Sequence, residues 1–182
     1  MNSPRSEHTA SVLTNGKVLV TGGYNYNHSL NSAEVYDPLT ETWTITGNMH
    51  TARYGHTSSI LTDGKVLVTG GARNDMSPKS TELYDPVTGT WSIVGNMNKE
   101  RVGHAAVVLL NGKVLVTGGS GERDSERSAE LFDPLTGNWT FTSEMHFERV
   151  SHTASVLTNG KVLVTGGEYN DMYINDAELY AL

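Results

Sequence analysis

One eight-residue string, Gly-Lys-Val-Leu-Val-Thr-Gly-Gly, occurs four times in this chain of 182 residues. The copies begin at residues 16, 64, 112 and 160, so each starts 48 residues after the one before it, without insertion or deletion. A fixed period of this length is the signature of a repeat architecture, in which one structural unit is stacked on its neighbours. The sequence therefore predicts four copies of a single unit.

The second copy predicts four short strands, at residues 57–61, 65–69, 81–84 and 91–94. Asp63-Gly64 separates the first two apolar runs, which is the strongest short-range signal for a hairpin. Asp85-Pro86 has the chemistry of a turn before the last strand. Val66-Leu67-Val68 is apolar on both faces, so the second strand should be covered on both sides. Each copy is expected to be a four-stranded antiparallel meander, since no window shows a helical period.

One such sheet cannot bury two apolar faces, but sheets stacked around an axis can, and this arrangement is a β-propeller with one copy per blade. We expect a single all-β domain over residues 5–182, with blades at 5–52, 53–100, 101–148 and 149–182. The last copy lacks the outer strand, which leaves an unpaired edge. Three arrangements remain open: a strained four-blade ring, a ring shared between two chains, and a piece of a longer propeller.

Paired glycines followed by aromatic residues at fixed offsets resemble the kelch repeat. The glycine pairs lie at 22/23, 70/71, 118/119 and 166/167, the first aromatic residue at 36, 84, 132 and 180, and Trp at 43, 91 and 139. The amino-acid sequence of the repeats is most similar to the galactose-oxidase-like branch of kelch propellers. That branch implies a copper radical site with a Tyr cross-linked to a Cys, and this chain has no Cys. Propellers host unrelated activities, so the resemblance indicates fold rather than function.

The composition excludes several classes of function. The net charge is −7, which disfavours non-specific binding to nucleic acid because that needs Lys and Arg. No signal peptide and no apolar run of membrane-spanning length is visible, so we expect a soluble protein, cytoplasmic by default. We expect no cofactor, because the sequence contains no catalytic or phosphate-binding motif.

Charged residues recur at the start of each copy and admit two interpretations. A ring of imidazoles could hold a metal, or each histidine could fix its own blade, and the second is favoured. These histidines are His8, His56, His104 and His152. The arginines three residues earlier could form an axial cluster for an acidic peptide, or could pair with the glutamates that open the third strands. These arginines are Arg5, Arg53, Arg101 and Arg149, and the glutamates are Glu34, Glu82, Glu130 and Glu178.

Four nine-residue loops, at 24–32, 72–80, 120–128 and 168–176, are where the copies differ throughout. In a meander these loops share one rim with the Arg-x-x-His segments, and variable loops on a constant scaffold are how binding surfaces are usually built. The candidate ligand-binding residues are Tyr24, Tyr26, His28, Arg73, Asp75, Arg123, Arg127, Tyr169, Tyr173, Arg53, Arg101 and Arg149.

The sequence favours a non-enzymatic module that binds a protein or peptide through the loop-bearing face. Self-association into a dimer that completes a larger ring is a further expectation. Two alternatives stay open. One is a galactose-oxidase-like enzyme fragment or metal-binding propeller. The other is a self-assembling or engineered repeat with a purely structural role, because the copies are nearly identical.

Overall fold

Four antiparallel sheets follow one another along the chain, and we number them blades I to IV. The computed structural model describes residues 1–26, 28–73 and 78–180. Blade I contains β1 (Thr9–Val12), β2 (Val18–Thr21), β5 (Ala33–Asp37) and β6 (Thr42–Ile45). Blade II contains β7 (Thr57–Ile60), β8 (Val66–Thr69), β9 (Ser80–Asp85) and β10 (Thr90–Asn96). Blade III contains β12 (Ala105–Val108), β13 (Val114–Thr117), β15 (Ala129–Asp133) and β16 (Asn138–Phe141). Blade IV contains β17 (Thr153–Val156), β18 (Val162–Thr165) and β21 (Ala177–Tyr180).

Every sheet is a meander in which strands adjacent in space follow one another in the blade. The order is β1-β2-β5-β6 in blade I, with the same pattern in blades II and III, and β17-β18-β21 in blade IV. The predicted all-β fold, with a last blade of three strands among the described residues, is therefore confirmed. Ala181 and Leu182, which stand where the other copies have Asp-Pro, lie outside the described residues. Within the described ranges, no helix has the length and hydrophobicity needed to cross a lipid bilayer.

Three small ribbons occupy part of the segments predicted as irregular loops. They are β3 (Tyr24–Asn25) with β4 (His28–Ser29), β19 (Glu168–Tyr169) with β20 (Met172–Tyr173), and β11 (Arg101–Val102) with β14 (Ser120–Gly121). The β19–β20 hairpin turns at Asn170 and Asp171, which have φ of 50° and 60°. Asn and Asp tolerate this left-handed region, so the pair forms a tight turn where the sequence predicted an irregular loop.

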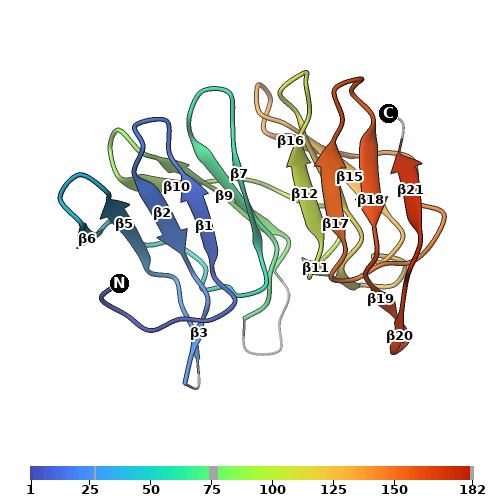
Figure 1. Ribbon diagram of the computed structural model, residues 1–182, viewed down its shortest axis with the longest axis horizontal. Helices are drawn as coiled ribbons and strands as arrows, with labels where there is room; N and C mark the ends of the chain where they lie inside the picture. Colours follow the sequence, from blue (N-terminus) through green and yellow to red (C-terminus); the bar gives the residue numbers. More distant parts are fainter. Residues whose placement is uncertain (27, 74–77, 181–182) are drawn as a thin grey trace.

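The innermost strands pack side by side in chain order, β1 against β7, β7 against β12, and β12 against β17. Figure 1 shows the result as an open arc, with blade I at one end and blade IV at the other. Within the described residues the ring is not closed. The strained four-blade ring is therefore wrong: the rotation between neighbouring repeats sets the curvature, and four of these blades do not complete a circle.

The apolar core lies between the blades. Val66, Leu67 and Val68 in β8 are each 0% exposed, which confirms that the second strand is covered on both faces. The core between blades I and II joins residues from both sheets and from the linker between them. Its buried members are Leu13, Leu19, Ala33, Met49, Val66, Val68, Tyr84 and Trp91. Equivalent clusters fill the joints between blades II and III and between blades III and IV. These three joints hold the loop-bearing ends of the blades in fixed positions.

Candidate functional site

The repeated arginines are buried in ion pairs within their own blades. Arg101 is 0% exposed, and its Nη2 lies 3.0 Å from Oε1 of Glu130, which is also 0% exposed. The Nη1 of Arg101 donates to the backbone carbonyls of Gly118 and Ser128 at 2.8 and 3.0 Å. Arg101 therefore ties the linker that carries it to the ends of β13 and β15.

The same pairing recurs in the other three blades. The Arg–Glu distances are 3.0 Å for Arg5–Glu34, 3.0 Å for Arg53–Glu82 and 3.2 Å for Arg149–Glu178. Burial alone would raise the pKa of Glu82, but hydrogen bonds from the backbone amides of His50 and Thr51 lower it below its usual value, so this carboxylate stays charged. The side chains of these arginines are 0% exposed and their Nη donors are occupied inside the blades, which leaves them unsuited to bind an acidic peptide at the axis.

The repeated histidines bind the neighbouring blade. The Nε2 of His104 lies 2.8 Å from the Thr57 hydroxyl and 3.2 Å from that of Thr69. His56 makes the equivalent pair of contacts with Thr9 and Thr21 at 3.0 and 3.2 Å. His152 contacts Thr117 at 2.9 Å and lacks a second hydroxyl, because position 105 is Ala. Each of these histidines therefore cross-links its own blade to the one before it.

These three imidazoles are neutral in the folded protein. Burial, and then the positive charge of the nearby arginines, lowers the pKa of His56 and His104 to about 3 and that of His152 to about 4. Over the described part of the chain, no group of three or more His, Cys, Asp and Glu side chains is arranged to hold a metal ion. A structural role accounts for every contact of His56, His104 and His152.

The segments before the histidines and the starts of the variable loops lie on one rim of the arc. Ser6 bridges to Tyr24, Tyr54 to Ala72, and Val150 to Glu168, each in antiparallel fashion. The β11–β14 ribbon is the equivalent contact in blade III. Both kinds of segment therefore share a rim, as the meander topology predicts, and Figure 1 shows β3, β19 and β20 projecting from that side. We call this side the loop rim.

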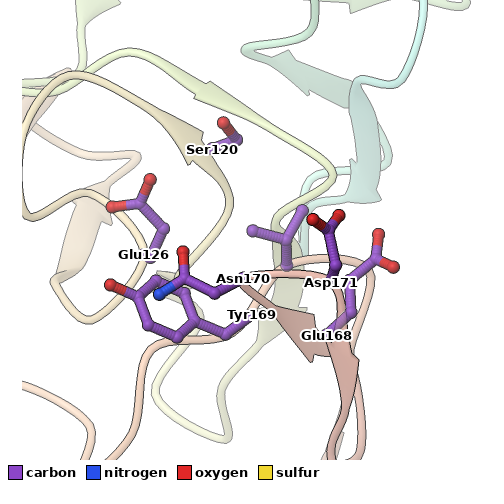
Figure 2. A pocket seen from close by; sticks show the side chains of 7 residues that line it. Ser120, Glu126, Glu168, Tyr169, Asn170 and Asp171 are labelled. Carbon is purple, nitrogen blue, oxygen red and sulfur yellow. The ribbon is translucent and has the colours of Figure 1, made fainter.

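Among the described residues, hollows open on the loop rim, and three of them have loop residues in their lining. The first, of about 380 Å³, lies between blades III and IV. Its lining is Ser120, Glu126, Val150, Glu168, Tyr169, Asn170 and Asp171. Figure 2 shows Glu126, Tyr169 and Asn170 on one side of this hollow and the carboxylates of Glu168 and Asp171 on the other. Three carboxylates and a phenol make this hollow suited to a cationic group.

The second hollow, of about 320 Å³, adjoins the first through Tyr169 and is mostly apolar. Phe147, Met172 and Tyr173 line it and are 53%, 68% and 89% exposed. Exposed large apolar side chains that gather in one place indicate an interaction site. The third hollow, of about 300 Å³, lies on blade I beside Tyr24 and Tyr26.

The predicted binding residues are distributed along the loop rim rather than brought into one pocket. Tyr24, Tyr26 and His28 lie on the β3–β4 ribbon, and Tyr24 stacks edge-on against Tyr54 with ring centroids 5.4 Å apart. Arg73 is exposed on blade II, and Asp75 lies outside the described residues.

On the second half of the arc, Arg123 and Arg127 are exposed on blade III, and Arg127 lies 3.2 Å from a Glu144 carboxylate oxygen. Tyr169 and Tyr173 lie on the β19–β20 ribbon and line hollows. Sequence reasoning missed Glu126, Phe147, Asp171 and Met172. The Asn-Asp turn was the available signal for two of them, since it predicts a hairpin that presents its flanking residues.

Blades built as four-stranded meanders around an axis, with loops gathered on one rim, define a β-propeller of the kelch-like class. The family model described as the Attractin/LZTR1 beta-propeller matches residues 1–167. The chain belongs to this family. No curated protein matches it significantly. The predicted propeller is confirmed, whereas the galactose-oxidase-like branch stays a prediction.

Proposed function

We propose that this propeller is a non-enzymatic module that binds a protein or peptide segment through the loop rim. One observation carries the proposal: the repeated arginines and glutamates pair inside their own blades, whereas the two hollows beside blade IV are lined mainly by residues that differ between copies. β-Propellers of this family are commonly protein-interaction modules, which supports the same function.

The two adjoining hollows of blade IV indicate the chemistry of the partner. The first presents the carboxylates of Glu126, Glu168 and Asp171, so it favours the ammonium of a Lys or the guanidinium of an Arg. The second presents the apolar surfaces of Phe147 and Met172, so it favours an apolar side chain. Because Tyr169 lines both, the partner would be a segment with a basic residue close to an apolar one.

A random peptide library displayed on phage tests this proposal. Selection on the wild-type chain should enrich sequences that pair a basic with an apolar residue. A synthetic peptide of the enriched sequence should then bind at least about tenfold more weakly, or by about 1.4 kcal/mol, to the rim variant Glu126→Gln/Tyr169→Ala/Asp171→Asn. Asp171→Asn keeps a residue type that tolerates positive φ, so this variant should fold.

The control variant is Leu39→Ala/Val87→Ala/Leu135→Ala, whose three side chains are 92% to 94% exposed on the turns of the opposite rim. It should bind the peptide with wild-type affinity, and both variants should melt near the wild-type temperature. Equal affinity for the wild-type chain and the rim variant, or no enrichment at all, would contradict the proposal.

A further inference from the structure

Among the described residues, one face of blade I has no neighbouring blade, and we call this face the first edge. It is formed by Val12, Val18, Tyr36 and Trp43. Val12 is 63% exposed, and Tyr36 and Trp43 are half-buried. In blade II, the equivalent Tyr84 and Trp91 are 2% and 9% exposed, because blade I covers them. The first edge is therefore a joint surface that lacks its cover.

Blade IV leaves the opposite face uncovered, and we call it the last edge. It is formed by Leu157, Leu163, Ala177 and Leu179. Leu179 is 53% exposed and Leu163 is half-buried. The residues equivalent to Leu163 in blades II and III, Leu67 and Leu115, are 0% exposed. This face has the composition of a joint, with nothing among the described residues packed on it.

The three existing joints share one set of contacts, except that the joint between blades III and IV has a single threonine hydroxyl, because position 105 is Ala. In the joint between blades II and III, the amide of Gly71 donates to the Arg101 carbonyl at 2.9 Å. His104 contacts two threonine hydroxyls of blade II. A Cβ placed on Gly70 would lie 2.5 Å from the Arg101 carbonyl oxygen and 3.2 Å from Cε of Met97, so the linker packs directly on that glycine. A Met of the linker, together with an Arg and a His of the later blade, thus meets two glycines and a threonine pair of the earlier blade.

Each open edge has one side of this contact set: the last edge has the glycines and the threonine pair, and the first edge has the Met, the Arg and the His. At the last edge, the hydroxyls of Thr153 and Thr165 lie 2.8 Å apart, in the arrangement of the Thr57–Thr69 pair. Beside them, a Cβ on Gly166 would meet only the Ile174 carbonyl oxygen, at 3.7 Å, so the space above this glycine is open. At the first edge, the residues 48 positions before Met49, Arg53 and His56 are Met1, Arg5 and His8. The last edge therefore offers the acceptor surface for the linker that the first edge presents.

We propose that a second copy of this chain docks head to tail, with its first edge on the last edge of the first copy, and that the reverse contact closes a ring of two chains. His8 of one copy would contact Thr153 and Thr165 of the other, and Met1 would cover Gly166. Two chains give eight blades, which is the upper end of the ordinary range for propellers. A third copy would exceed that range, and closure removes both open edges. Because blade IV has three strands among the described residues, the joint would use the inner three strands of each sheet.

The test uses one charge at each edge of the chain. Val12→Glu places a carboxylate on the first edge, and Leu179→Glu places one on the last edge. Both side chains are more than half exposed in a single chain, so neither variant should lose its fold, which circular dichroism checks. The matched controls are Val87→Glu and Leu135→Glu, which are 92% and 94% exposed on the outer turns. The readout is the molar mass from light scattering on a size-exclusion column at micromolar concentrations.

We expect the wild-type chain and both controls to be dimers, and each edge variant alone to be a monomer. An equimolar mixture of Val12→Glu and Leu179→Glu should again form a dimer, because the intact last edge of the first variant meets the intact first edge of the second. A monomeric wild-type chain would overturn the proposal, since the edges would then belong to another occupant. An edge variant that remains a dimer on its own would also overturn it, because the copies would then associate without the edge that carries the charge. A mass that grows beyond two chains would overturn the closed ring.

Discussion

His104 shows how a repeated polar residue can belong to the framework rather than to a site. Its ring lies inside the joint between blades II and III, where Nε2 contacts the hydroxyls of Thr57 and Thr69. Burial and the positive charge of Arg101 lower its pKa from 6.5 to about 3. The neutral ring is therefore the form that the folded protein requires at physiological pH, and protonation favours the unfolded chain.

Replacing His104 should flatten the dependence of stability on pH. Between pH 6.5 and pH 3 the unfolded chain binds a proton at this position and the folded chain does not, so the free energy of unfolding falls as the pH falls. In the wild-type protein this residue should remove about 2 kcal/mol of stability between pH 7 and pH 5, and His104→Gln should abolish that loss. Urea unfolding at both pH values measures the difference.

The control for this experiment is Thr57→Val, which removes a hydroxyl partner but keeps the titrating ring. It should lower the free energy of unfolding by a similar amount at both pH values, leaving the slope intact. A gap between the wild-type chain and His104→Gln that stays the same at pH 7 and pH 5 would contradict the assignment.

At the level of the element, the ends of β2, β8 and β13 are points of close contact between neighbouring blades. Gly70 follows β8 with a φ of +61°, and the linker backbone of the next blade lies directly over it. Only Gly combines that conformation with so close an approach. The paired glycines that mark the repeat in the sequence are therefore contact points between blades as well as strand ends.

Gly70→Ala should destabilise the protein much more than Gly137→Ala. Both positions have positive φ, which costs a residue with a Cβ about 1–2 kcal/mol. At Gly137 a Cβ would meet nothing within 4 Å, whereas at Gly70 it would lie 2.5 Å from the Arg101 carbonyl oxygen. Overpacking of this kind adds about 1–3 kcal/mol. Chemical denaturation of the two variants measures the difference, and equal losses would show that backbone conformation alone, rather than the joint, requires glycine at position 70.

The strands could be predicted from the sequence because three local signals agree. Asp63-Gly64 and Asp85-Pro86 place the turns of blade II, and the apolar run of β8 places its buried centre. The ribbons on the loop rim could not be predicted as readily, since they occur in segments that differ from copy to copy. The pair Asn170-Asp171 is an example. It forms a tight turn, but the strands on either side, which include Tyr169 and Met172, are too short to show the alternation of apolar and polar residues that predicts a strand.

At the level of the whole molecule, the repeat predicts which residues form each joint between blades, but not the total angle through which the three joints rotate the blades about the axis. Nearly identical copies make the joints similar, and the angle between blades depends on how side chains such as Met49 and Trp91 pack between sheets. The placement of the variable loops on one rim followed from meander topology. The hollows beside blade IV could not be predicted in this way. Their lining includes Glu126, Phe147 and Tyr169, which come from three separate segments of the chain that meet only in the folded protein.

The central claim is that the repeated residues build the frame and the differing loops recognise the partner. A loop exchange tests it most directly: residues 168–176 are replaced by the sequence of residues 24–32. The exchange keeps the frame contact, since Arg149 would face Ser at position 176, as Arg53 and Arg101 face Ser80 and Ser128 at 3.0 and 2.7 Å. Calorimetry of the chimera, together with titration of the peptide selected on the wild-type chain, gives stability and binding in one sample.

The chimera should melt within about 4 °C of the wild-type chain, which corresponds to about 1 kcal/mol, and should bind the peptide at least about tenfold more weakly. Wild-type affinity in the chimera would contradict the account, because recognition would then lie outside the variable loops. A chimera that fails to fold would contradict it as well, because the loops would then be part of the frame.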